Sequence, residues 1–131
     1  MYAAPSVVGK HWIYDLQGGN RDLLNDEDFV KEALSGAATA ADATLLSISS
    51  KKFEPQGVTA VALLAESHLS LHSWPEYGYA AIDAFTCGDR TDPQKACDYL
   101  RKAFEGTHGS IRILKRVCPN ISLLQLQGVV P

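Results

Sequence analysis

The strongest constraint on the fold is the period of the apolar residues, which is helical in two segments and strand-like elsewhere. In the first helical segment, 26–41, apolar residues recur at i, i+3 or i+4, and i+7. They are Phe29, Val30, Ala33, Leu34, Ala37, Ala40 and Ala41. Asn25 or Asp26 is placed to cap this helix, and the acidic residues of its first turn suit the helix dipole. The pattern predicts one amphipathic helix.

The second helical segment begins with Asp92 and Pro93, which suit the N-cap and the first helical position. Its apolar stripe consists of Ala96, Tyr99, Leu100, Ala103 and Phe104. Gly106 follows the stripe and suits the C′ position, where a left-handed backbone is common. We predict a second helix that ends just before this glycine.

The other apolar segments are rich in β-branched and aromatic residues and are bounded by turn residues. The predicted strands are 6–16, 43–53, 58–66, 79–87 and 110–117. Residues 68–74 alternate apolar and polar side chains, and Pro75 and Gly78 interrupt the chain after them. We take the order as β-α-β-β-β-α-β. Two helices on one face of a mostly antiparallel sheet, an α+β two-layer sandwich, is the natural packing.

Size and charge narrow the class of protein. A chain of 131 residues, 46% hydrophobic and 21% charged, is expected to form one domain, 1–131. The net charge of −3 gives no basic patch for nucleic acid, and no run reaches the roughly 18 apolar residues of a membrane span. The N-terminal residues lack a signal-peptide pattern, and Cys87, Cys97 and Cys118 form no CxxC pair. We expect a cytoplasmic protein that binds neither nucleic acid nor membrane.

Polar and reactive side chains are concentrated in the stretch 63–89, which otherwise resembles two apolar strands. Taken alone, Ser67 is most simply a polar residue at a strand junction. His68 and His72 have an HxxxH spacing, but four residues of a strand span about 13 Å, so we predict no metal site. Cys87 is either a buried thiol or the partner of His72 in a Cys–His protease pair.

Strand alternation separates the two most reactive of these side chains. Ser67 and His72 are five residues apart, and an odd spacing sends them to opposite faces of one continuous strand. Either the two residues do not cooperate, or the backbone at Glu66–Ser67 is kinked before the strand begins. A strained turn would suit a bond that breaks.

The same stretch resembles the prokaryotic S-adenosylmethionine decarboxylases, small pyruvoyl enzymes of polyamine synthesis. The residues that carry the resemblance are Glu66-Ser67-His68-Leu69, His72, Trp74-Pro75-Glu76, Gly78-Tyr79-Ala80-Ala81, Asp83 and Phe85-Thr86-Cys87-Gly88. Upstream, "KFEPQGVTAV" is similar to another segment of the family. The likeness covers most of the chain and fades after about Gly106.

The resemblance implies a proenzyme that cuts itself. A serine like Ser67 attacks the carbonyl of Glu66, the resulting ester is eliminated, and the new N-terminus becomes a pyruvoyl group. The products would be a β chain, 1–66, and an α chain, 67–131. His72 matches the histidine that handles protons during processing. Thr59 stands where relatives have a serine that assists processing, so its stiffer, β-branched side chain puts the speed of processing in question.

The resemblance also implies the later reaction. The pyruvoyl ketone would form a Schiff base with S-adenosylmethionine and release CO2, giving the aminopropyl donor for spermidine. Cys87 matches the acid that reprotonates the α-carbon. Glu76 matches the residue that holds the ribose hydroxyls, and Phe53 matches the aromatic residue that stacks on adenine. Trp74 lines that pocket, belongs to a dimer contact, or packs in the core.

Three interpretations remain open. The first is an S-adenosylmethionine decarboxylase that works as a homodimer of αβ protomers with sites at the interface. The second is a relative with the same pyruvoyl group that decarboxylates arginine or ornithine. The third is a non-enzymatic paralogue. Phe53 and Glu76 favour the first over the second, and an intact Ser67, His72 and Cys87 argue against the third.

Overall fold

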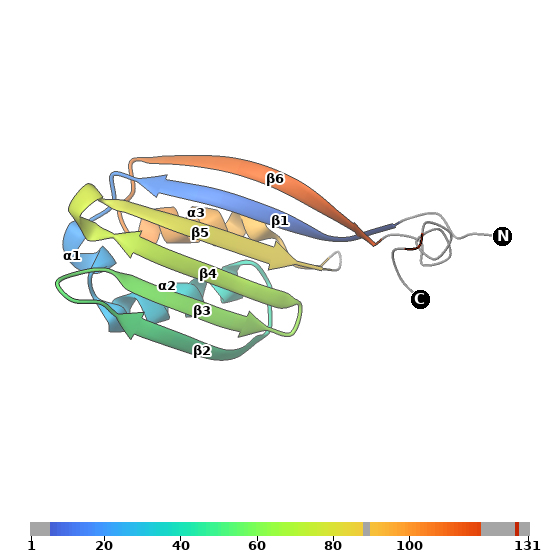
Figure 1. The fold of residues 1–131 in the computed structure, drawn as a ribbon, viewed down its shortest axis with the longest axis horizontal. Helices are drawn as coiled ribbons and strands as arrows, with labels where there is room; N and C mark the ends of the chain where they lie inside the picture. Colours follow the sequence, from blue (N-terminus) through green and yellow to red (C-terminus); the bar gives the residue numbers. More distant parts are fainter. Residues whose placement is uncertain (1–5, 88–89, 119–127, 129–131) are drawn as a thin grey trace.

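In the computed structural model, which describes residues 6–87, 90–118 and 128, the chain forms a six-stranded sheet with helices on one face (Figure 1). The strand order is β2-β3-β4-β5-β1-β6, and every neighbouring pair is antiparallel. The strands are β1 Ser6–Gln17, β2 Leu45–Lys52, β3 Val58–Leu64, β4 Ser67–Trp74, β5 Tyr79–Thr86 and β6 His108–Cys118. The helices are α1 Arg21–Leu24, α2 Glu27–Ala40, the 3₁₀ turn η1 Pro75–Tyr77 and α3 Pro93–Ala103. The predicted α+β sandwich is confirmed.

The predicted order of elements is wrong by one strand, because four strands lie between α2 and α3 instead of three. The alternating segment after β3 is a strand of its own, β4. It is separated from β5 by η1 and by Gly78, which has a left-handed backbone with φ 60°. A Cβ at Gly78 would lie 3.0 Å from the carbonyl oxygen of Gly19. Glycine is therefore strongly favoured where this turn meets the end of β1.

The helix caps agree with the sequence at the N-termini. The Asp26 carboxylate accepts the Phe29 N–H at 3.0 Å, and the Asp92 carboxylate accepts the Gln94 N–H at 3.1 Å. The C′ residue of α3 is Glu105, with φ 59°, so the assignment of Gly106 to this position is wrong by one residue. The short helix α1 was not predicted, because four residues carry too little periodicity.

The core lies between the helices and one face of the sheet. Along β3, β4 and β5 every second residue points into this layer, and the largest fully buried side chains include Leu69, Leu71 and Ile82. Ser73 is a polar exception, since its hydroxyl donates to the Leu24 carbonyl and accepts the Val58 N–H. None of the helices in the described part of the chain is long and apolar enough to cross a membrane.

The opposite face of the sheet, here called the open face, has no helix over it among the described residues (Figure 1). It carries the other half of each strand, which includes most of the unusual side chains of the stretch 63–89. Val61 and Leu63 of β3 are 41% and 51% exposed on this face. A sheet face with exposed apolar residues and partly buried histidines differs from the solvated face of an ordinary antiparallel sheet.

Candidate active site

The Glu66–Ser67 bond lies where the chain turns from β3 into β4. Ser67 has φ 147°, a backbone conformation that non-glycine residues rarely adopt and that costs about 1–3 kcal/mol. Strict alternation would send Ser67 to the helix-covered face, yet Ser67 and its neighbour His68 line the same groove. The kink that the sequence offered as one of two alternatives is therefore present.

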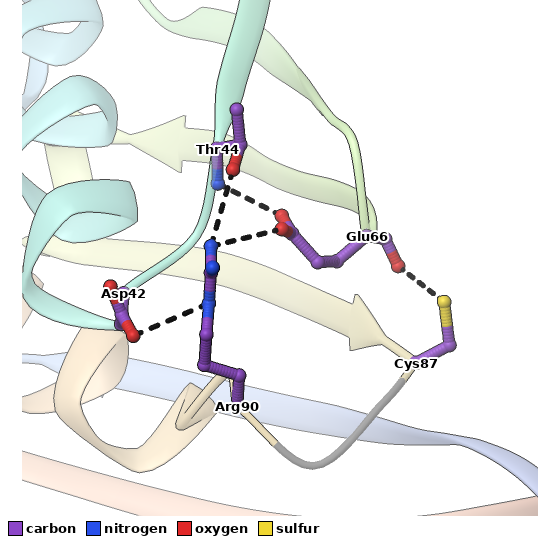
Figure 2. Close-up of polar contacts among 5 residues, drawn as sticks. All are labelled: Asp42, Thr44, Glu66, Cys87 and Arg90. Carbon is purple, nitrogen blue, oxygen red and sulfur yellow. Dashed lines mark hydrogen bonds and ion pairs between the residues drawn. The ribbon is translucent and has the colours of Figure 1, made fainter.

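The carbonyl oxygen of Glu66 receives two hydrogen bonds from Cys87. The Cys87 N–H donates at 3.1 Å. The Cys87 thiol donates from Sγ at 2.9 Å (Figure 2). Register explains this contact, because Ser67 pairs with Thr86, and Cys87 comes directly after it. Donors on a peptide carbonyl stabilise negative charge that develops on its oxygen when a nucleophile attacks the carbon. The geometry suits attack at this carbonyl.

The side chain of Glu66 is held by a network formed by Asp42, Thr44, Glu66 and Arg90 (Figure 2). Glu66 Oε1 accepts the Thr44 N–H at 2.9 Å, and the Arg90 guanidinium lies 3.7 Å from Glu66 Oε2 and 3.4 Å from Asp42 Oδ2. The Thr44 N–H bond is the largest cause that lowers the pKa of Glu66 below its usual value. The Glu66 network therefore fixes the side chain of the residue before the bond, and Cys87 fixes its carbonyl.

A groove of about 330 Å³ opens beside Ser67 on the open face. It is lined by Val8, His11, Ser67, His68, Phe85, Arg116 and Val117. Phe85 contacts three of the other lining residues: the rings of His11 and His68 lie 6.1 Å and 5.8 Å from the Phe85 ring, and the Arg116 guanidinium lies 5.6 Å above it. The lining of the groove therefore combines apolar side chains with cationic or titratable ones.

A second cluster of predicted residues surrounds His72. Thr59 pairs with His72 across β3 and β4, and its Oγ1 lies 2.5 Å from His72 Nδ1. The Trp74 ring packs on His72 at a centroid distance of 4.2 Å, and the Phe53 ring lies 5.9 Å from the His72 ring. Trp74 is only partly buried and lies outside the core, so the core alternative for Trp74 is wrong. Phe53 is 40% exposed and available for stacking.

Glu76 lies near this cluster, in η1 directly after β4. Its Oε2 accepts a hydrogen bond from the Gln56 amide at 3.0 Å. Its Oε1 is buried and has no hydrogen-bond partner among the described residues. A buried carboxylate oxygen without a partner is costly, and hydroxyl groups of a ligand could satisfy it.

The structure brings the predicted residues together in two groups that are not adjacent within one chain. Glu66, Ser67 and Cys87 lie at the start of β4, whereas His72 and its neighbours lie toward its end. Five residues of a strand span about 16 Å, so Ser67 and His72 are out of contact reach along the same strand. The Cys87–His72 pair does not form within the chain, because His72 pairs with Ala81, well before Cys87. In the described part of the chain, no metal-binding cluster of three His, Cys, Asp or Glu residues occurs.

Sequence reasoning missed two features of the site. The first is the contact of His68 with Ser67, whose Nδ1 and Oγ atoms lie 3.0 Å apart. Its signal was present, since the two residues are adjacent, but His68 was considered only as a metal ligand. The second is the Glu66 network, whose Thr44 is 22 residues away in the sequence and carried no signal.

Comparisons with known proteins agree with the motifs around Ser67. A family model described as S-adenosylmethionine decarboxylase matches residues 10–117. The chain is 50% identical over 113 residues to the S-adenosylmethionine decarboxylase proenzyme of Synechococcus sp. (strain WH7803), a match covering 86% of this chain and 88% of that protein. It is 52% identical over 95 residues to the proenzyme of the same name from Brevibacillus brevis (strain 47), with coverage of 72% and 71%. The crystal structure of the adenosylmethionine decarboxylase from Aquifex aeolicus VF5 is 35% identical with a TM-score of 0.78, and the match covers 85% of this chain and 92% of that one.

Proposed function

The chain belongs to the S-adenosylmethionine decarboxylase family, and we propose that it decarboxylates S-adenosylmethionine after it cuts its own Glu66–Ser67 peptide bond. The observation that carries this proposal is the pair of hydrogen bonds from Cys87 to the Glu66 carbonyl, beside a serine in a strained conformation. The relatives in which this family is recognised are proenzymes by name. A proenzyme needs one bond prepared for cleavage, and Glu66–Ser67 has the features of such a bond.

Self-cleavage follows from the groups at this bond. Ser67 Oγ attacks the Glu66 carbonyl carbon, and the charge that develops on the oxygen is stabilised by the Cys87 N–H and thiol. The C–N bond then breaks, leaving Glu66 as an ester on Ser67 Oγ and a free amine at Ser67. Removal of the Ser67 α-proton expels the Glu66 carboxylate from Cβ. The products are a β chain, 1–66, and an α chain, 67–131, and hydrolysis of the new N-terminus releases ammonia.

A pyruvoyl group at position 67 fits the residues present. Ser67 lines the groove, so a ketone derived from it would face the open side of the sheet. Once formed at position 67, this group would supply the electron sink that decarboxylation of an α-amino acid requires. The Cys87 thiol adjoins the same position and can donate a proton to the α-carbon of the substrate once CO2 has left.

The nucleoside part of the substrate is assigned to the second cluster. Phe53 has an exposed ring that can stack on adenine, and Trp74 can extend the same aromatic wall. Glu76 has an unpartnered buried oxygen that can accept a ribose hydroxyl. Arginine and ornithine carry no ribose or adenine. These residues therefore favour S-adenosylmethionine over a free basic amino acid.

The distance between the two clusters supports a homodimer with shared sites. Glu76 and Phe53 are too far from Ser67 along the sheet to serve the same substrate within one chain. A two-fold axis that stacks the open faces of two copies can bring the start of β4 in one near the end of β4 in the other. The exposed Val61 and Leu63 provide apolar surface for this contact. His72 and Thr59 then also approach Ser67 from the second copy.

Intact-mass measurement tests the first part of the proposal. Purified chain should yield two fragments, 1–66 and 67–131, the latter lacking the mass of ammonia and carrying a ketone. Ser67→Ala should remain whole and inactive. A wild-type chain that stays whole on long incubation, or a Ser67→Ala variant that still releases CO2 from S-adenosylmethionine, refutes self-cleavage as the source of activity. Faster CO2 release from arginine or ornithine would move the substrate assignment to the second interpretation.

Mixed dimers test the shared site. Ser67→Ala and Glu76→Ala are each expected to be nearly inactive alone. After co-expression, random pairing of two-fold dimers should restore about one quarter of wild-type activity, because one site of each mixed dimer contains both intact residues. Two copies of Ser67→Ala, combined in the same way, serve as the control. No recovery in the mixture would mean that Ser67 and Glu76 act within one chain.

A further inference from the structure

We propose that His68 is the base that accepts the proton of Ser67 when the serine attacks the Glu66 carbonyl. The inference rests on the proposed self-cleavage and adds the base that activates the serine in its first step. Ser67 Oγ lies 3.0 Å from His68 Nδ1, within hydrogen-bond distance of a reacting atom. His68 is therefore assigned as a catalytic residue of processing, distinct from His72.

Other bases in the described part of the chain are poorly placed for this step. The carboxylate of Glu66 is occupied by the Thr44 N–H and Arg90. Within one chain His72 lies about 16 Å away along β4. In the proposed dimer a second copy's His72 approaches Ser67, but its Nδ1 is bonded to Thr59, and it is assigned to the later removal of the α-proton. His11 lines the same groove, but its Nε2 is bonded to Asp83 at 2.9 Å. Among the described residues, only His68 forms a side-chain hydrogen bond with Ser67 Oγ.

A hydrogen bond between adjacent hydroxyl and imidazole side chains is not sufficient for a site. The same contact occurs between Thr107 Oγ1 and His108 Nδ1 at 2.8 Å, on an exposed part of the chain. Three things distinguish the pair at Ser67. The serine backbone is strained, the preceding carbonyl is held by two donors from Cys87, and the pair opens onto the groove. Nucleophile, base and oxyanion donors therefore meet at one carbonyl.

The step balances with these groups alone. With Nδ1 unprotonated, the Ser67 hydroxyl donates to it and transfers its proton as Oγ bonds to the Glu66 carbon. The carbonyl electron pair moves to the oxygen, where Cys87 donates two hydrogen bonds. As the oxygen re-forms its double bond, the C–N bond breaks, and the His68 imidazolium returns the proton to the departing nitrogen. The Ser67 α-proton remains in place, and its later removal is left to the His72 that approaches from the second copy of the proposed dimer.

Substitution of His68 distinguishes two possible roles of its side chain, as a base that takes the serine proton and as a group that only orients the serine hydroxyl. In His68→Asn an amide oxygen can still accept the serine hydroxyl but cannot take its proton at neutral pH. Both His68→Asn and His68→Ala should therefore slow self-cleavage by about 100-fold or more. The uncut chain should resist hydroxylamine, which cleaves esters, because the block precedes the ester. Imidazole should accelerate cleavage of His68→Ala, since the groove is open to solvent.

His108→Asn is the matched control, because it alters the second adjacent pair and should cleave at the wild-type rate. Cleavage of His68→Asn at the wild-type rate would overturn the inference and leave His68 an orienting role. Accumulation of a hydroxylamine-sensitive ester in His68→Ala would also overturn it, since the block would then lie after the first step. Rescue by imidazole would show that His68→Ala is folded. Failure of the wild-type chain to cleave would refute the proposed function itself.

Discussion

Cys87 has two proposed roles, one in self-cleavage and one in decarboxylation, and substitution can separate them. The structure shows the contact that serves the first role. The Cys87 thiol donates to the Glu66 carbonyl at 2.9 Å, which serves self-cleavage. Its proposed donation of a proton to the substrate carbon serves decarboxylation. Cys87→Ser keeps a donor on a side chain of similar length, whereas Cys87→Ala removes it. Both variants keep the Cys87 backbone N–H bond, at 3.1 Å in the wild type.

The size of the effect follows from this geometry. Loss of one oxyanion donor typically slows acyl chemistry by about 10²–10³. A thiol is a weak donor and the backbone N–H remains, so we expect the lower end for Cys87→Ala, a slowing of about 100-fold or about 2.7 kcal/mol. Cys87→Ser should cleave within about tenfold of the wild-type rate, since a hydroxyl donates more strongly than a thiol. Both variants should decarboxylate poorly after cleavage, because the alanine side chain has no proton to donate and a serine hydroxyl is a much weaker acid than a thiol.

The assay follows the intact chain and its two fragments over time on denaturing gels and by mass, and then measures CO2 release per cleaved chain. Cys118→Ala is the control for loss of a second exposed thiol. A Cys87→Ala chain that cleaves as fast as wild type would refute the role of the thiol at the Glu66 carbonyl. Cleaved Cys87→Ser with full CO2 release would refute the role of Cys87 as proton donor.

Three further predictions concern the supports of the site. The pKa of Glu66 is lowered, so its ionised carboxylate stabilises the fold at pH values above the usual pKa of 4.5, and this contribution is lost as the pH falls through the lowered pKa. In the uncleavable Ser67→Ala background, Glu66→Gln should therefore unfold at a lower urea concentration than its parent at pH 7. The difference should shrink toward pH 3. Gly78→Ala should lower the free energy of unfolding by about 1–2 kcal/mol, because φ is 60° at this position, and an unchanged melting temperature would contradict that loss. The same substitution should raise the KM for S-adenosylmethionine, because it displaces Glu76. Ser73→Ala should cost about 1–3 kcal/mol by leaving two buried backbone groups without their side-chain partner, and an equal urea midpoint would contradict it.

Local pattern was enough to predict the layers of the fold. The helical period over 26–41 and the caps at Asp26 and Asp92 depend on residues within a few positions of one another, and the structure has them as predicted. The error in strand count was the omission of the alternating segment 68–74 from the predicted order, although its alternation and the break at Pro75 and Gly78 were recognised. In the structure this segment is β4, which pairs with β3 and β5 and is followed by η1.

The site was predictable only where a motif named the residue. Ser67, Cys87 and Glu76 were chosen through resemblance, and the family it named is confirmed by the comparisons. Alternation identified the conflict between Ser67 and His72 but could not decide between its two outcomes. The structure has the kink at Ser67, and within one chain the side chains of Ser67 and His72 still lie far apart along β4. The contact of Thr44 with Glu66 joins segments that no local pattern connects.

The strand order explains how a chain cut at this bond can remain one folded unit. The segment before the bond contributes β1, β2 and β3, and the segment after it contributes β4, β5 and β6. In the sheet the strands of the two segments are interleaved, because β1 lies between β5 and β6, and β3 pairs with β4 (Figure 1). The core is shared in the same way, with Leu16 and Leu34 from the first segment packed with Leu71 and Phe104 from the second. Neither segment can leave without breaking ladder bonds and exposing the core, whereas the bond itself lies in a turn where cleavage would relieve the strain at Ser67. The fold can therefore hold this bond in a costly conformation and lose it without losing its own stability.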